Sequence, residues 1–240
     1  MLFGYYYGFD LTYIVLVLPC LILAMIASSN VNSTFKRYST KYSQRRITGA
    51  QAAQRVLSAN GVSGVRIERV SGNLTDHFDP RTNVIRLSDS VYDSYSVAAI
   101  GVACHEAGHA VQYARHYAPI KLRAAIIPIT NIGSKLAMPL ILIGILLSFG
   151  ESVSYGFVYA GIACFSLSLL FQLVTLPVEF NASRRAMQAI DSANILTDEE
   201  QKGARKTLTA AAMTYVAATA VALAQLLRLL LIFGGGRRRD

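Results

Sequence analysis

Charged residues are scarce in this sequence, and acidic ones are the scarcest. Of 240 residues only 15% are charged, with 14 Asp and Glu against 23 Lys and Arg, while 53% are hydrophobic. Soluble domains usually carry about 25% charged residues. The shortage therefore argues against a soluble protein and favours one that is embedded in a membrane.

Cysteine is also rare, with only three residues in the chain. Cys20 and Cys164 lie within apolar runs, and an odd total leaves one thiol over, so a disulfide framework is excluded. Cys104 adjoins His105, but neighbours on a helix point about 100° apart. We expect Cys104 to be a buried packing residue and not a metal ligand.

The excess of basic residues gives a net charge of +9, which would suit nucleic acid or anionic lipid as a partner. No nucleic-acid-binding motif accompanies the charge, and the sequence has no internal repeat or low-complexity tract. The basic residues cluster beside apolar runs, as the topology signals of membrane proteins do. We therefore predict a lipid bilayer, and no nucleic acid, as a partner.

Four stretches are long and apolar enough to cross a bilayer, which takes about 20 helical residues. They cover about Leu11–Ala27, Ala124–Phe149, Tyr155–Phe180 and Leu208–Phe233. Basic residues follow the first stretch and none precede it, so it reads as an uncleaved anchor with its N-terminus outside. Pro128, Lys135 and Pro139 interrupt the second stretch, so its first half is expected to be interfacial or broken.

The distribution of basic residues places 31–123 and 181–207 on the cytoplasmic side. The loop between the second and third stretches, Gly150–Gly156, has no Lys or Arg and belongs outside. A fourth crossing would export the basic tail Gly234–Asp240, so the last apolar helix is either transmembrane or interfacial. The sequence predicts a mainly α membrane protein with three to four transmembrane helices. Its parts are an N-terminal anchor (1–30), a cytoplasmic segment (31–123), a transmembrane hairpin (124–180), a cytoplasmic helix (181–207), and an apolar helix with a basic tail (208–240).

The cytoplasmic segment is predicted to form a small α+β unit. An amphipathic pattern over Thr48–Asn60, ended by Gly61, indicates a helix. Strands are expected at Val65–Val70 and Asn83–Ser88, with Asn73–Asp79 as an additional extended edge. Several N-cap residues follow, including a capping box that begins at Ser90.

A further helix, from about Ser96 to Tyr117, carries the motif H-E-x-x-H. His105 and His109 lie four residues apart, so both imidazoles share one helix face and can bind one Zn²⁺. Glu106 projects to one side of the pair, from where it can accept a proton from zinc-bound water. Ala107 and Gly108 leave room for another element. The alternative is a solvated helix face with incidental histidines.

A catalytic zinc usually has three protein ligands and one open position. His116 is excluded as the third, because it lies about 10.5 Å from His109 along a continuous helix. Another class of zinc peptidases places a third histidine after a helix-breaking glycine, and Gln112 holds that position here.

Glu179 is the better candidate for the third ligand. It follows Pro177, where the third apolar stretch is expected to meet the cytoplasm. A carboxylate at the end of an apolar helix is costly unless it pairs, reaches water or binds metal. The spacing leaves two interpretations open: a zinc ligand, or an interfacial charge that Arg184 or Arg185 neutralises.

Several long blocks in fixed order carry a resemblance that covers nearly the whole chain. They include "GNLTDHFDPRTNVIRLSDSVYDSYSVAAIGVACHEAGHAVQYA", "LPVEFNASRRAM" and "GARKTLTAAAMTYVAA". Through them the chain resembles the YugP-type neutral zinc metallopeptidases of bacterial membranes, which are gluzincin-like. The resemblance implies a zincin-like catalytic part, one Zn²⁺ per chain held by His105, His109 and Glu179, and Glu106 as general base. In more distant membrane peptidases the motif E-x-x-x-D follows, and here Ser183 stands at the Asp position.

The expected function is zinc-dependent hydrolysis of a peptide or membrane-protein substrate at the cytoplasmic membrane face. The substrate backbone would add as a strand to Asn73–Asp79. Four residues are candidate donors to the tetrahedral oxyanion, namely His77, Arg184, Arg185 and Tyr215.

Three other functions fit the sequence less well. An intramembrane zinc protease would place a later Asp ligand in a span, and the third and fourth stretches contain no Asp. A catalytically silent, zinc-braced scaffold would normally use four protein ligands, and only three good ones are found. A transporter would need polar groups at mid-bilayer, and only Lys135, Gln225 and Arg228 are arguable.

Overall fold

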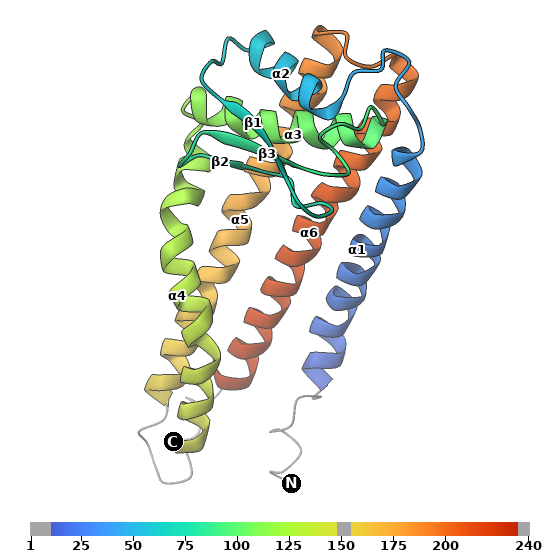
Figure 1. Ribbon diagram of the computed structural model, residues 1–240. Coiled ribbons are helices and arrows are strands. Elements are labelled where there is room, and N and C mark those ends of the chain that lie inside the picture. The colour runs from blue at the N-terminus through green and yellow to red at the C-terminus, as the bar shows by residue number, and fades with distance from the viewer. Residues whose placement is uncertain (1–10, 148–154, 235–240) are drawn as a thin grey trace. The chain divides into compact units, whose positions relative to one another are not determined.

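The computed structural model describes residues 11–147 and 155–234 (Figure 1). The chain divides into two compact units, each built from separate segments. The first unit comprises Met1–Ile26, Leu122–Leu176 and Tyr215–Asp240, and the second comprises Ala27–Lys121 and Pro177–Thr214. The basic end of the tail and most of the predicted outer loop, 235–240 and 148–154, lie outside the described residues.

Four long helices confirm the mainly α membrane fold. A π-helical turn, η1 (Tyr13–Val17), leads into α1 (Leu18–Ser39), and α4 (Ala118–Leu147), α5 (Tyr155–Ser192) and α6 (Asp198–Gly234) follow. All four are long and apolar enough to cross a membrane. α5 and α6 also extend well beyond the predicted apolar runs into polar sequence.

Helix α4 is continuous, so its first half is not broken, and an interfacial position of that half stays a prediction. Pro128 and Pro139 lie inside α4, as Pro177 does inside α5. Membrane helices tolerate proline because side chains and neighbouring helices can satisfy the backbone groups that it frees. The prolines therefore leave each helix as a single element.

The second unit contains the small α+β part. Its elements are α2 (Gly49–Ala59), β1 (Arg66–Val70), β2 (His77–Asp79), β3 (Val84–Ser88) and α3 (Val97–Ala114). The strand order is β1-β3-β2, with β1 parallel and β2 antiparallel to β3. Apolar residues of α2, α3 and β3 form one buried core with residues from the parts of α5 and α6 in this unit.

Helix α3 begins where the sequence predicts and ends earlier than expected. Ser96, and not Ser90, is the N-cap: the Ser96 side chain accepts a hydrogen bond from the backbone N–H of Ala99 at 3.2 Å. At the other end His116 adopts a left-handed conformation with φ 53°, so the helix stops at Ala114 and does not reach Tyr117.

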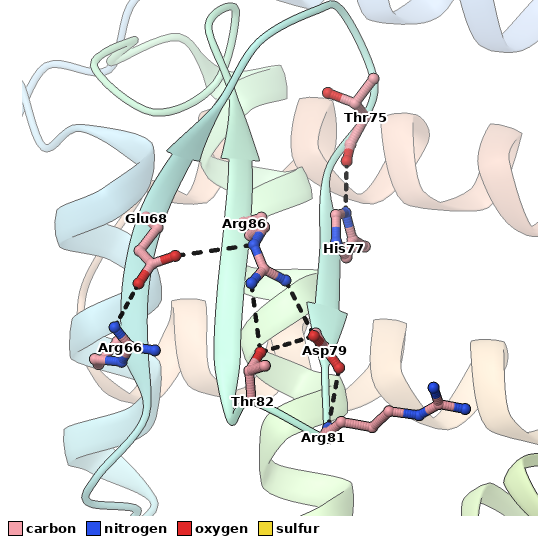
Figure 2. A network of polar contacts seen from close by, with 8 residues as sticks. All are labelled: Arg66, Glu68, Thr75, His77, Asp79, Arg81, Thr82 and Arg86. Atoms are coloured by element: carbon pink, nitrogen blue, oxygen red, sulfur yellow. Dashed lines mark hydrogen bonds and ion pairs between the residues drawn. The ribbon is translucent and has the colours of Figure 1, made fainter.

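The sheet buries one face and exposes a polar network on the other, as side chains alternate along β3 (Figure 2). Ile85 and Leu87 are fully buried, whereas Arg86 lies between Glu68 on β1 at 3.8 Å and Asp79 on β2 at 3.1 Å. Asp79 also accepts hydrogen bonds from the Thr82 hydroxyl at 2.7 Å and the Arg81 backbone at 2.9 Å. The network ties the edge strand β2 to the centre of the sheet.

Candidate metal centre

The site forms where α3 and α5 pack against each other without an intervening side chain. A Cβ atom at Gly108 would lie 2.7 Å from the carbonyl oxygen of Ala182, which is too close for any other residue. Glu179 and Ser183 lie one turn apart on α5, to either side of this contact. The small residue on α3 thus lets the two helices approach closely enough for their polar side chains to meet.

Glu179 meets both histidines of the motif. Its Oε2 lies 3.2 Å from Nε2 of His105 and 3.6 Å from Nε2 of His109. One potential ligand atom from each of the three residues lies within 4.8 Å of the others, an arrangement that could hold a metal ion. Glu179 is only 2% exposed, so its carboxylate is buried beside the two imidazoles.

The remaining nitrogen of each imidazole has a partner of its own. Nδ1 of His105 lies 3.1 Å from the hydroxyl of Ser183, and Nδ1 of His109 lies 2.9 Å from Oε1 of Gln112. The amide nitrogen of Gln112 donates to the carbonyl of Val178 at 2.8 Å. Such partners fix the orientation of ligand histidines and leave their Nε2 atoms directed at the shared site.

Comparison with known proteins identifies the family. Residues 13–234 match the family described as "Putative neutral zinc metallopeptidase". The chain belongs to this family. The "Putative membrane protease YugP" of Bacillus subtilis (strain 168) is 45% identical over 225 residues, which cover 94% of this chain and 98% of that protein. No solved structure matches the chain.

Family membership and the four apolar helices confirm the predictions of a membrane metalloprotease fold and of zinc as cofactor. The residues present fit the metal. Two imidazoles and one carboxylate form a common ligand set of catalytic zinc sites in peptidases. The cell membrane is accordingly where we place this metallopeptidase.

Negative charge dominates the surroundings of the two histidines. Burial alone would lower the pKa of His109, but its hydrogen bond to Glu179 and the charges of Glu106 and Glu179 outweigh burial and raise that pKa. The same charges that favour a protonated imidazole favour a bound cation. The field at the site is therefore suited to Zn²⁺.

Asp76, just before the edge strand β2, accepts hydrogen bonds from Ser88 at the end of β3. Burial raises the pKa of Asp76, hydrogen bonds from the backbone and hydroxyl of Ser88 lower it, and the charge of Glu106 raises it again, for a net increase. The charge of Glu106 on α3 is thus one cause of the raised pKa of Asp76, the residue that precedes β2. Glu106 itself is 9% exposed.

The other candidate residues from the sequence are not part of the metal-binding group. Arg185 donates to Asn181 at 2.8 Å and stacks over the ring of Tyr117. His77 is exposed on β2, with its Nδ1 2.8 Å from the carbonyl of Thr75. Tyr215 belongs to the first unit, and His116 follows the end of α3 and is not part of the metal-binding group.

A cleft of about 510 Å³ opens beside Ser183, between α5 and α6. Arg184, Asp191 and Arg205 contribute charged groups to its lining. Ser183 therefore faces both His105 and a space large enough for a substrate side chain.

Gln112, Asn181 and Asp76 are residues of the site that sequence reasoning missed. Gln112 lies three residues after His109, so the sequence alone places a polar side chain on the same helix face as the motif. The structure shows that this side chain is fully buried and therefore needs hydrogen-bond partners. Asn181 and Asp76 gave no such signal, because their partners come from elements distant in sequence.

Proposed function

We propose that this metallopeptidase cleaves peptide bonds by a gluzincin-type mechanism at the cytoplasmic face of the membrane. The observation that carries the proposal is the convergence of His105, His109 and Glu179 in a buried group, with Glu106 next to His105 on the same helix. Two imidazoles, one carboxylate ligand and an adjacent free carboxylate are the parts that zinc-dependent hydrolysis needs.

His105, His109 and Glu179 would hold the metal through two Nε2 atoms and a carboxylate oxygen. Bound Zn²⁺ supplies a Lewis acid that polarises the scissile carbonyl and acidifies water. Glu106 accepts the proton of the water whose oxygen bonds to the carbonyl carbon. It then delivers that proton to the amine nitrogen as the C–N bond breaks.

The edge strand β2 offers a template for an extended substrate. Within the described residues β2 pairs with β3 on one side only. The ring of Phe78 on β2 contacts the ring of Tyr113 on α3, with centroids 5.6 Å apart. A peptide that adds to the free edge would thus run along α3, the helix that carries Glu106.

The cytoplasmic placement rests on the basic residues. Lys36, Arg37 and Lys41 follow the first apolar run, and Lys121 and Arg123 precede the second. We assign 31–123 and 181–207 to the cytoplasm, with 1–30, 124–180 and 208–240 as the membrane-associated segments. Peptides and membrane proteins with an extended segment near this face are the expected substrates.

Replacement of Glu106 tests the core of the proposal. The variant E106Q should keep one zinc per chain and lose peptidase turnover by about 100-fold or more, since general acid–base catalysis contributes about 10²–10⁴. The control E199Q removes an exposed carboxylate at the start of α6 and should retain full turnover. Undiminished turnover of zinc-loaded E106Q would contradict the mechanism. Absence of peptidase activity in the zinc-loaded wild-type protein would favour a scaffold role.

A further inference from the structure

Basic side chains gather where the apolar parts of α1 and α6 end. Arg37 follows the first apolar run of the sequence, and Arg205 and Lys206 directly precede the last. These three residues line one pocket of about 440 Å³ between α1 and α6, inside the second unit. The two helices run side by side there (Figure 1). The pocket therefore lies at the level where each helix passes from apolar to polar sequence.

Tyr38 and Gly203 hold the two helices together at this pocket. Tyr38 is 7% exposed, and a Cβ atom at Gly203 would lie 2.7 Å from both Cδ1 and Cε1 of its ring. α6 thus rests directly on the tyrosine of α1. The Arg37 guanidinium lies 5.7 Å from the centroid of the same ring, a cation–π distance that orients it at the pocket wall.

The rest of the lining adds hydrogen-bond donors and no acid. Asn30, Thr34 and Thr209 complete the polar part of the wall. The Thr34 hydroxyl donates to Oδ1 of Asn30 at 3.3 Å, which leaves the amide N–H₂ group of Asn30 to donate. In the part of the chain that the structure describes, Arg37, Arg205 and Lys206 form no ion pair that would neutralise them. The pocket is consequently a site of uncompensated positive charge.

We propose that this pocket binds the phosphate headgroup of an anionic phospholipid. Guanidinium and ammonium groups with additional N–H and O–H donors match a phosphate and its polar substituent. Met213, which is 44% exposed, provides an apolar wall on the side toward the last apolar run. Basic pockets between membrane helices at the polar boundary are a recurrent way to hold anionic headgroups. The proposal does not depend on peptidase activity.

The test compares lipid retention by the full-length protein and two charge-matched variants. Protein is reconstituted in nanodiscs of phosphatidylcholine with a minor fraction of phosphatidylglycerol, extracted gently, and analysed by native mass spectrometry. R37Q/K206Q removes two charges from the pocket and leaves Arg205, which also lines the cleft beside Ser183. K36Q/K121Q removes two exposed charges beside apolar runs without touching the pocket.

We expect one tightly held phosphatidylglycerol in the wild type and in K36Q/K121Q, and affinity at least about tenfold weaker in R37Q/K206Q. If both variants lose lipid affinity equally, the effect is one of general surface charge and the proposal is overturned. If neither variant loses lipid affinity, the proposal is overturned as well. A further measurement compares the binding of inorganic phosphate with that of the lipid. Binding of free phosphate as tight as that of the lipid would assign the pocket to a soluble anion instead. Unchanged zinc content and thermal unfolding of R37Q/K206Q verify that the variant is folded.

Discussion

The side-chain oxygen of Gln112 lies 2.9 Å from Nδ1 of His109 and can only accept there. Gln112 is fully buried, and its amide nitrogen donates to the carbonyl of Val178 and to Oδ1 of Asn181. His109 must therefore donate from Nδ1, which leaves its Nε2, directed toward Glu179, as the atom available to a metal. One buried amide thus sets the imidazole tautomer that a metal requires, and it connects α3 to the backbone of α5.

The first prediction concerns this amide. Q112M keeps much of the side-chain volume and removes the acceptor for His109, so zinc should bind about 10–100-fold more weakly. Competition with a calibrated chelator measures the affinity. Q54M changes an exposed glutamine on α2 and should bind zinc as the wild type does. Equal affinity of Q112M and wild type would show that the hydrogen bond does not orient the ligand.

Two glycines of α3 should respond in opposite ways to alanine. In G108A the new methyl group meets the Ala182 carbonyl, so we expect α5 to shift, zinc content to fall, and the free energy of unfolding to drop by about 1–3 kcal/mol. In G101A the nearest atom is Cβ of Ala204 at 3.5 Å, an ordinary contact. Alanine there should leave stability unchanged or raise it by up to about 1 kcal/mol. Thermal unfolding in detergent with metal analysis distinguishes the two, and a tolerated G108A would refute the proposed close packing.

Strand addition predicts a dependence on the backbone of the substrate. A peptide substrate with a single N-methyl group beside the scissile bond loses one backbone donor and keeps every side chain. If that donor pairs with β2, kcat/KM should fall about 2–10-fold, since a hydrogen bond contributes about 0.5–1.5 kcal/mol. A scan of N-methyl positions should show alternate sensitive and insensitive residues, because only every second N–H of a strand faces its neighbour. A uniform response along the peptide would contradict pairing with an edge strand.

The polar face of the sheet should give stability that depends on pH. Hydrogen bonds from Thr82 and Arg81, together with the bond and charge of Arg86, lower the pKa of Asp79 from 3.8 to about 2. A lowered folded-state pKa means that the ionised carboxylate stabilises the fold above pH 3.8 and that this contribution is lost as pH falls toward 2. D79N should therefore melt below the wild type at pH 7, with the difference shrinking over that acidic range. The metal site is common to both proteins, so its own acid sensitivity cancels. A difference that is constant with pH would be inconsistent with the lowered pKa.

The helices and the metal-binding group could be anticipated because their signals are local. Histidines four residues apart share a helix face whatever surrounds them, and a carboxylate at the end of an apolar run is conspicuous because burial is costly. Glu179 was therefore found from the sequence, and the structure brings it to His105 and His109. Its role as a ligand stays a prediction until metal is seen on it.

Features that depend on contacts between distant segments could not be read in advance. The residues around Gln112 in the sequence do not indicate that its side chain will bond to Val178 and Asn181. The parallel pairing of β1 with β3 likewise depends on the chain passing through β2 first, which alternation along single strands does not encode. The choice of Ser96 among the candidate N-cap residues of α3 is a further example. The segment before the helix is held by backbone pairing with Lys41 and Tyr42, far earlier in the chain.

Arg205 lines both the cleft beside Ser183 and the pocket that faces Arg37. One guanidinium cannot pair fully with an anion in the pocket and another anion in the cleft at once. Occupancy of the pocket and occupancy of the cleft are therefore linked through this side chain, and linkage of this kind is reciprocal. If the pocket holds a lipid headgroup and the cleft a substrate side chain, the composition of the bilayer would affect the affinity for substrate, and a bound substrate would affect which lipid the protein keeps.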